Sequence, residues 1–314
     1  MLNKTIWLLW LQGWENVPWL VEQVAESWEI NNPQWNIKHV TLDNIHKYVN
    51  DIDYIYDKSK NISPQHKADI IRLSLLKNYG GVWADATMLC MQPLSTWVEE
   101  AVKPAGLWMY HGHGAGMSGK NGPAIWLIIS EKNSLMISKW KSACDEYWRN
   151  RTEADSYFWF DGLFRKLFES DVEFKNKWKL APHLYSELKG QAHSLARHNR
   201  MMMITNNQDV KMILQEKPPY ALKLWWKDWQ SNFPDVNSPE CKNSNGYYAI
   251  KMSKRNFIFK HEMACKCSII FQVRIFILDM NYFLRQQLIM LIKMYVKKLY
   301  LKTQLVYSVL TNLN

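Results

Sequence analysis

Three side chains that could bind a charged or hydroxylated ligand lie close together in the sequence of residues 63–93, SPQHKADIIRLSLLKNYGGVWADATMLCMQP. Asp69 and Arg72 are three residues apart, so a helix would present them on one face. Asp85 comes after a short apolar run and is followed two residues later by Thr87. Carboxylate and hydroxyl oxygens can ligate a hard divalent cation, and a guanidinium can bind phosphate. This grouping therefore predicts a polar ligand site.

The elements that would position these side chains are a helix and a strand joined by glycines. Ser63 can cap the helix, and Pro64 fits its first turn, where a missing N–H costs nothing. A core-facing stripe at helical spacing then follows, made of Ala68, Ile71, Leu75 and Leu76. Gly80-Gly81 ends the helix. Residues 82–84 predict a buried strand that carries Asp85 to its carboxyl end, where ligands of α/β sheets usually bind.

Each of these polar residues also has a plainer explanation. An Asp–Arg pair on one helix face is often a surface ion pair of roughly 0.2–0.5 kcal/mol. An Asp after a strand is often a turn residue or a cap. The combination of Asp69, Arg72, a Gly-Gly turn and Asp85-Ala86-Thr87 in one stretch favours a shared site instead.

The rest of the chain alternates between strand and helix patterns. Strands are predicted at 4–10, 35–40, 106–110 and 124–129, and helices at 18–30, 43–57 and 134–148. This order is typical of an α/β fold and suits a nucleotide-binding domain.

The segment KADIIRLSLLKNYGGVWADAT resembles the signature of sugar-nucleotide glycosyltransferases related to capsular polysaccharide synthesis proteins, the family-32 type with a GT-A fold. That signature ends in a metal-binding DxD motif, which here is Asp85-Ala86-Thr87 and lacks the second carboxylate. The resemblance covers residue 3 to about residue 230 and is most specific at 3–14 and 63–94. It implies a Mn²⁺ or Mg²⁺ ion held by Asp85 and Thr87.

The same resemblance implies roles for residues that bind the donor. Trp7 matches the aromatic residue that lies over the nucleotide base, where stacking is worth about 1–3 kcal/mol per base; filling of the core is the alternative. Asp69 would accept hydrogen bonds from ribose or sugar hydroxyls, and Arg72 would face the donor sugar or the diphosphate.

Two later segments extend the resemblance. The aromatic run YFWFDGLF, residues 157–164, holds Asp161, whose apolar neighbours would raise its pKa toward values useful in catalysis. A helix cap is the equal alternative for this residue. The segment YALKLWWK resembles the family's closing HKLTxK motif, but the family His falls on Leu222. Lys223 and Lys227 would then neutralise phosphate charge alone, unless they are simply solvated lysines.

The positive charge of the chain lies at its C-terminal end. The formal net charge is +10, and residues 241–314 hold 12 Lys and Arg against two acids, which leaves 27 basic and 27 acidic residues in 1–240. A nucleic-acid-binding fold usually spreads its basic charge over the domain. We therefore expect no nucleic-acid groove; binding of nucleic acid through the basic end is a weaker possibility.

Cysteine usage and hydropathy favour a cytoplasmic protein. The five Cys are odd in number and show no zinc-type spacing, so no disulfide framework is indicated. No run of 18 uncharged apolar residues is present to span a membrane. Residues 283–302 do show an apolar stripe with lysines off it, which predicts a basic amphipathic helix on an anionic membrane surface. A helix docked on the body and a disordered end are the alternatives.

Together these observations predict an α/β, GT-A-like fold with a Rossmann-like mixed sheet flanked by helices over 1–240, and a helical basic extension over 241–314. The resemblance implies a retaining transfer of sugar from a nucleotide-diphosphate donor to a glycan or lipid-linked glycan acceptor of a surface polysaccharide, capsule or O-antigen. Asp161 and Arg72 are the expected catalytic residues. A non-catalytic glycan- or nucleotide-binding protein is the alternative.

Overall fold

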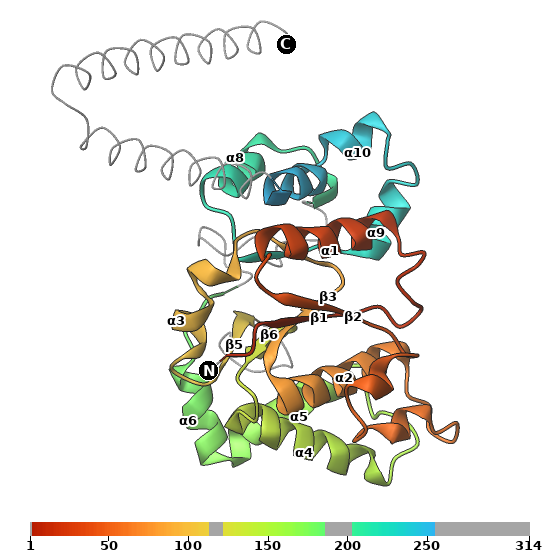
Figure 1. The fold of residues 1–314 in the computed structure, drawn as a ribbon, viewed down its shortest axis with the longest axis vertical. Coiled ribbons are helices and arrows are strands. Elements are labelled where there is room, and N and C mark those ends of the chain that lie inside the picture. Colours follow the sequence, from red (N-terminus) through yellow and green to blue (C-terminus); the bar gives the residue numbers. More distant parts are fainter. Residues whose placement is uncertain (1, 113–121, 186–202, 255–314) are drawn as a thin grey trace, which may run out of the picture. The chain divides into compact units, whose positions relative to one another are not determined.

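The fold is a five-stranded mixed sheet with helices on both faces (Figure 1). The computed structural model describes residues 2–112, 122–185 and 203–254. The strand order is β2-β1-β3-β6-β5, in which β1 runs parallel to β2 and β3, whereas β6 is antiparallel to β3 and β5. The strands are β1 (Thr5–Leu9), β2 (Asn36–Val40), β3 (Gly81–Asp85), β5 (Leu107–Gly112) and β6 (Gly122–Ser130). The predicted α/β class and mixed sheet are confirmed.

A second, two-stranded antiparallel sheet pairs β4 (Met88–Cys90) with β7 (Ala221–Lys223). The sequence analysis predicted neither strand, because three residues are too few to show a period. The helices of the described residues are α1 (Trp19–Asn31), α2 (Pro64–Tyr79), α3 (Val98–Val102), α4 (Leu135–Arg149), α5 (Trp159–Ser170), α6 (Val172–Leu180), α8 (Gln208–Glu216), α9 (Trp226–Asn232) and α10 (Pro239–Asn243).

The helix predicted over 43–57 is wrong. The structure has two short 3₁₀ turns there, Ile45–Lys47 and Asp53–Tyr56. The Asn44 side chain accepts a hydrogen bond from the Thr41 N–H and donates one to the His39 carbonyl. Such local side-chain bonds compete with helical backbone bonds, so the segment turns instead of winding.

The α2–β3 unit forms as its sequence predicts. Ser63 Oγ accepts a hydrogen bond from the His66 N–H and caps the helix, with Pro64 in the first turn. Gly80 and Gly81 have φ angles of +71° and +98° and end it. A Cβ on Gly81 would collide with the Thr5 carbonyl oxygen of the neighbouring strand. Glycine is therefore required both for the turn and for the close approach of β3 to β1.

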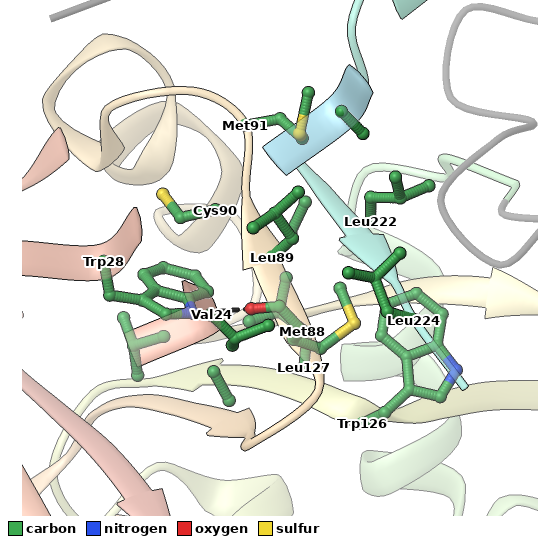
Figure 2. Packing of buried hydrophobic residues seen from close by; sticks show 14 of the residues in the cluster. Val24, Trp28, Met88, Leu89, Cys90, Met91, Trp126, Leu127, Leu222 and Leu224 are labelled. Atoms are coloured by element: carbon green, nitrogen blue, oxygen red, sulfur yellow. Dashed lines mark hydrogen bonds between the residues drawn. The ribbon is translucent and has the colours of Figure 1, made fainter. Parts of the chain in front are cut away.

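Both faces of the sheet are buried, and successive residues of β1 alternate between two apolar cores. Ile6 and Leu8 join the core beneath α1, whereas Trp7 and Leu9 join the core beneath α2 and α4. In the first core, the Trp28 indole N–H donates to the Met88 carbonyl over 2.7 Å, which ties α1 to β4 (Figure 2).

The compact body extends past the predicted boundary at residue 240. It spans Met1–Phe257, and a second unit spans Ile258–Asn314. Cys241 and Ile250 are buried in the same core as α1, and Lys254 forms an ion pair with Glu26 at 2.5 Å. The predicted amphipathic helix over 283–302 lies outside the described residues. Among the residues that the structure describes, no helix has the length and apolar character needed to cross a membrane.

Replacement of Gly81 by alanine should destabilise the protein, because the new Cβ meets backbone and φ is positive. We expect Gly81→Ala to lower the free energy of unfolding by at least about 1–3 kcal/mol, measured by urea denaturation. Gly162→Ala is the matched control, since its Cβ meets nothing within 4 Å inside α5. That variant should gain about 0.5–1 kcal/mol. Equal stabilities of the two variants would contradict this account of the turn.

Candidate functional site

A cavity of about 1310 Å³ lies at the carboxyl ends of the parallel strands β1 and β3. Crevices at this edge of an α/β sheet are the usual place for ligands. Six of the eight residues predicted for the site line it, namely Asp69, Arg72, Asp85, Thr87, Asp161 and Lys223. They come from α2, from the end of β3 and the turn after it, from α5 and from β7.

Arg72 is the centre of the polar wall. Its Nη2 atom lies 3.1 Å from Asp69 Oδ1 and 3.6 Å from Asp85 Oδ1. Its Nη1 donates to the Ile125 carbonyl, and the guanidinium lies 5.1 Å from the centre of the Trp83 ring. The Asp69–Arg72 pair is buried, with side chains 10% and 6% exposed. It is therefore not the surface pair that its spacing alone would allow.

Asp85 is held by donors on both of its oxygens. The Trp83 indole N–H donates to Oδ1 over 3.0 Å, and Lys223 Nζ donates to Oδ2 over 2.7 Å. Partial burial works to raise the pKa of Asp85, but the charges of Lys223 and Arg72 outweigh it and hold the pKa below its ordinary value. Asp85 is thus a carboxylate at neutral pH.

The pKa of Asp69, in contrast to that of Asp85, is raised. Burial raises its pKa to about 7, the charge of Arg72 opposes this rise, and the charges of Asp161 and Asp85 add to it. Its carboxyl group therefore exchanges a proton near neutral pH and can donate as well as accept a hydrogen bond.

Asp161 lies in the first turn of α5 and is 7% exposed. Phe158 is the residue at the N-cap position, so Asp161 is not the cap of this helix. It faces the cavity close enough to Asp69 for their charges to interact. Asp161 is thus a third carboxyl group in the cavity, beside those of Asp69 and Asp85.

Two predicted site residues do not line the cavity. Trp7 is 2% exposed, and its indole N–H donates to the Gly80 carbonyl over 3.0 Å. The alternation of β1 sends it into the core beneath α2, so the prediction that it lies over a base is wrong. Lys227 is exposed on α9 and lies away from the cavity, because the helix that starts at Trp226 turns it outward.

Leu222, which stands at the position of the family His, lies in the core and does not line the cavity. Its side chain has no exposed surface and lies in the core beneath α1, where Leu222 pairs with Leu89 of β4 (Figure 2). Adjacent residues of a strand point to opposite sides, so Lys223 faces the cavity.

Trp10 and Trp225 line the cavity and were missed by the sequence analysis. Trp10 is the first residue after β1, and Trp225 follows β7 closely. The rule that ligands bind beyond the carboxyl ends of strands would have singled out Trp10 instead of Trp7. Tyr157 and Phe158 also line the cavity and are 66% and 64% exposed, so they form its mouth.

The residues around Asp85 do not fit a divalent metal ion as they are arranged. Within the described ranges no three His, Cys, Asp or Glu residues come together to hold one. Thr87 supplies a neutral hydroxyl, and the Lys223 ammonium already lies against Asp85. A metal on that carboxylate would face a fixed positive charge. The Mn²⁺ or Mg²⁺ implied by the resemblance stays a prediction that this donor set does not favour.

Comparisons with known proteins identify the family of the chain. The model of the capsular polysaccharide synthesis protein family matches residues 1–232. A glycosyltransferase of Aspergillus fumigatus, afumC, is 25% identical over 161 residues, which cover 46% of this chain and 39% of that protein. An O-glycosyltransferase of Annulohypoxylon truncatum, braB, is 23% identical over 175 residues, which cover 49% of this chain and 40% of that protein.

The chain therefore spans about two fifths of the length of these curated relatives. Among solved structures, the PaToxG glycosyltransferase covers 82% of this chain and 86% of its own, at 12% identity and a TM-score of 0.36. That score is too low to carry an argument about function.

Asp69 should make stability depend on pH. In the folded state it binds a proton below about pH 7, whereas its ordinary pKa is 3.8. Between pH 3.8 and pH 7 the folded state binds more protons than the unfolded state. The stabilisation that comes from protonated Asp69 is therefore complete below pH 3.8 and is lost as the pH rises through 7. The unfolding free energy of the wild type relative to Asp69→Asn should fall by up to about 1.4 kcal/mol per pH unit there.

Urea denaturation across that window measures this slope. Asp53→Asn, a change at an exposed carboxylate away from the cavity, is the control and should follow the wild-type profile. Parallel profiles for wild type and Asp69→Asn would contradict the raised pKa.

Proposed function

Because this chain belongs to the capsular polysaccharide synthesis protein family, we propose that it is a glycosyltransferase that takes a sugar from a nucleotide-diphosphate donor. One observation supports this most. Asp69 and Arg72 from α2 and Asp85 from β3 meet in a single cavity at the carboxyl edge of the sheet. That edge binds nucleotides in many α/β proteins.

The donor would lie along the strand ends of the cavity. Trp10 and Trp225 offer aromatic faces for the base. Arg72 and Lys223 offer the positive charges that a diphosphate needs. Asp69, whose carboxyl both donates and accepts near neutral pH, is suited to the hydroxyl groups of the sugar or ribose.

In the transfer step, the bond between the anomeric carbon and the diphosphate oxygen breaks, and its electron pair leaves with the diphosphate. An acceptor hydroxyl oxygen forms the new bond to that carbon and gives up its proton. We assign this proton to the Asp161 carboxylate, which lines the same cavity as Arg72. The charges of Arg72 and Lys223 stabilise the departing diphosphate.

The acceptor would enter past Tyr157 and Phe158 at the mouth of the cavity. Aromatic faces suit the apolar faces of sugar rings. The family description supports a surface polysaccharide or its lipid-linked precursor as acceptor, and the name of one relative supports transfer to oxygen. Retention of the anomeric configuration is part of the proposal, and NMR of the product anomeric proton would test it.

Asp161→Asn should separate binding from chemistry. We expect the rate of sugar transfer to fall about 10²–10⁴-fold, because an amide cannot take the proton. Donor affinity should stay within twofold of the wild type. The measurement is turnover on a panel of nucleotide-diphosphate sugars by mass spectrometry, with donor binding by calorimetry. Glu100→Gln, at an exposed carboxylate on α3 outside the cavity, is the control.

A wild-type protein that binds nucleotide diphosphates but turns over no donor of the panel would contradict the proposal. It would favour the alternative, a non-catalytic nucleotide- or glycan-binding protein of the same family.

Trp10→Ala should weaken binding of the nucleoside diphosphate alone. Loss of one stacked base–aromatic contact costs about 1–3 kcal/mol, or roughly 5–150-fold in affinity. Calorimetric titration measures it, with Tyr56→Ala as a control at an exposed aromatic residue outside the cavity. Unchanged affinity in Trp10→Ala would remove this residue from the proposed base site.

A further inference from the structure

The cation that touches the Asp85 carboxylate belongs to the protein itself. Lys223 Nζ lies 2.7 Å from Oδ2, and its side chain is 10% exposed. The other oxygen accepts from the Trp83 indole and lies 3.6 Å from Arg72. Asp85 ends the strand where the related signature holds its metal. The position of a metal ion is therefore already taken by an ammonium group.

The backbone fixes Lys223 in this place. In the pairing of β4 with β7, Lys223 lies opposite Met88. Met88 comes three residues after Asp85 in the sequence. The next residue, Leu224, donates its N–H to the Thr87 carbonyl over 2.9 Å. Leu222 on the preceding position is buried in the core and anchors the strand. Lys223 is thus a positioned group and not a long side chain that happens to reach a carboxylate.

Two cations of the protein lie beside Asp85. Lys223 brings one positive charge to the place of the ion, and Arg72 brings another from α2. An ammonium has three N–H bonds, and Asp85 accepts one of them. Within the described ranges Asp85 is the hydrogen-bond partner of Lys223, so donors remain for phosphate oxygens on the cavity side.

We propose that Lys223 replaces the divalent cation of this site, so that the protein binds the donor diphosphate and transfers the sugar without a metal. The Asp85 carboxylate holds the ammonium in place, and Arg72 supplies the second positive charge from α2. The inference rests on the proposed function for the identity of the ligand as a nucleoside diphosphate. The independence from metal, with Lys223 in the place of the ion, goes beyond it.

Calorimetry of the full chain, stripped with EDTA, tests the proposal with UDP and GDP as probes. Wild type should bind at least one of them, and addition of Mn²⁺ or Mg²⁺ should change the affinity less than twofold. Lys223→Met should lose at least tenfold in affinity without metal and recover on addition of Mn²⁺, because Asp85 is then free for the ion. Lys223→Arg should retain metal-free binding, since it keeps the charge.

Lys217→Met is the matched control, because Lys217 is exposed, lies shortly before β7 and does not line the cavity. Thermal unfolding of each variant confirms that it is folded. Paramagnetic resonance of Mn²⁺ gives a readout independent of activity. In the presence of the nucleotide, bound Mn²⁺ should be found with Lys223→Met and not with wild type.

Three results would overturn the inference: stripped wild type that binds neither diphosphate, wild type whose affinity rises tenfold or more with Mn²⁺, or Lys223→Met that binds as wild type does. Sugar transfer that requires added metal would also overturn it, while the proposed function stands. Metal-free binding that depends on Lys223, with no transfer from any donor, would support the replacement of the metal in binding and contradict the proposed function.

Discussion

The site depends on charge balance among the side chains that line one cavity. Asp69, Asp85 and Asp161 line the same cavity, and isolated carboxylates are costly to bury. Arg72 and Lys223 offset part of this charge by direct contact with Asp69 and Asp85. Burial also raises the pKa of Asp69 to about 7, so this carboxyl group is partly protonated at neutral pH. A ligand that brings phosphate charge therefore enters a site whose cations are already held in place.

The scaffold that holds these charges is rigid because both faces of the sheet are covered. Trp28 ties α1 to β4 on one face (Figure 2). On the other face, the Trp7 indole ties β1 to Gly80. Gly81 lets β3 approach β1 closely. Asp85 is the last residue of β3 and pairs with Leu9 of β1, so its position is set by backbone pairing and not by a flexible loop.

Local patterns predicted the part of the site that is close in sequence. Asp69 and Arg72 share a helix face, and a glycine turn leads directly to the strand that carries Asp85. The structure brings these three residues to one cavity, and the sequence could indicate this because each step covers one element or one turn. The prediction failed for Trp7, because a strand buried on both faces has no polar side to show which residues face a ligand. It failed also for the helix over 43–57, where side-chain bonds to the backbone favoured turns.

The sequence by itself determined the α/β class, the capped helix α2 with its glycine end, and the presence of Asp69, Arg72 and Asp85 in one region. Only the tertiary structure decided what contacts them. Lys223 lies 138 residues from Asp85 and reaches it because β7 pairs with β4. Strand pairing over such a separation depends on how the whole core packs, and two three-residue strands carry no periodic signal of it. The same pairing decides that Leu222 fills the core while its neighbour faces the ligand.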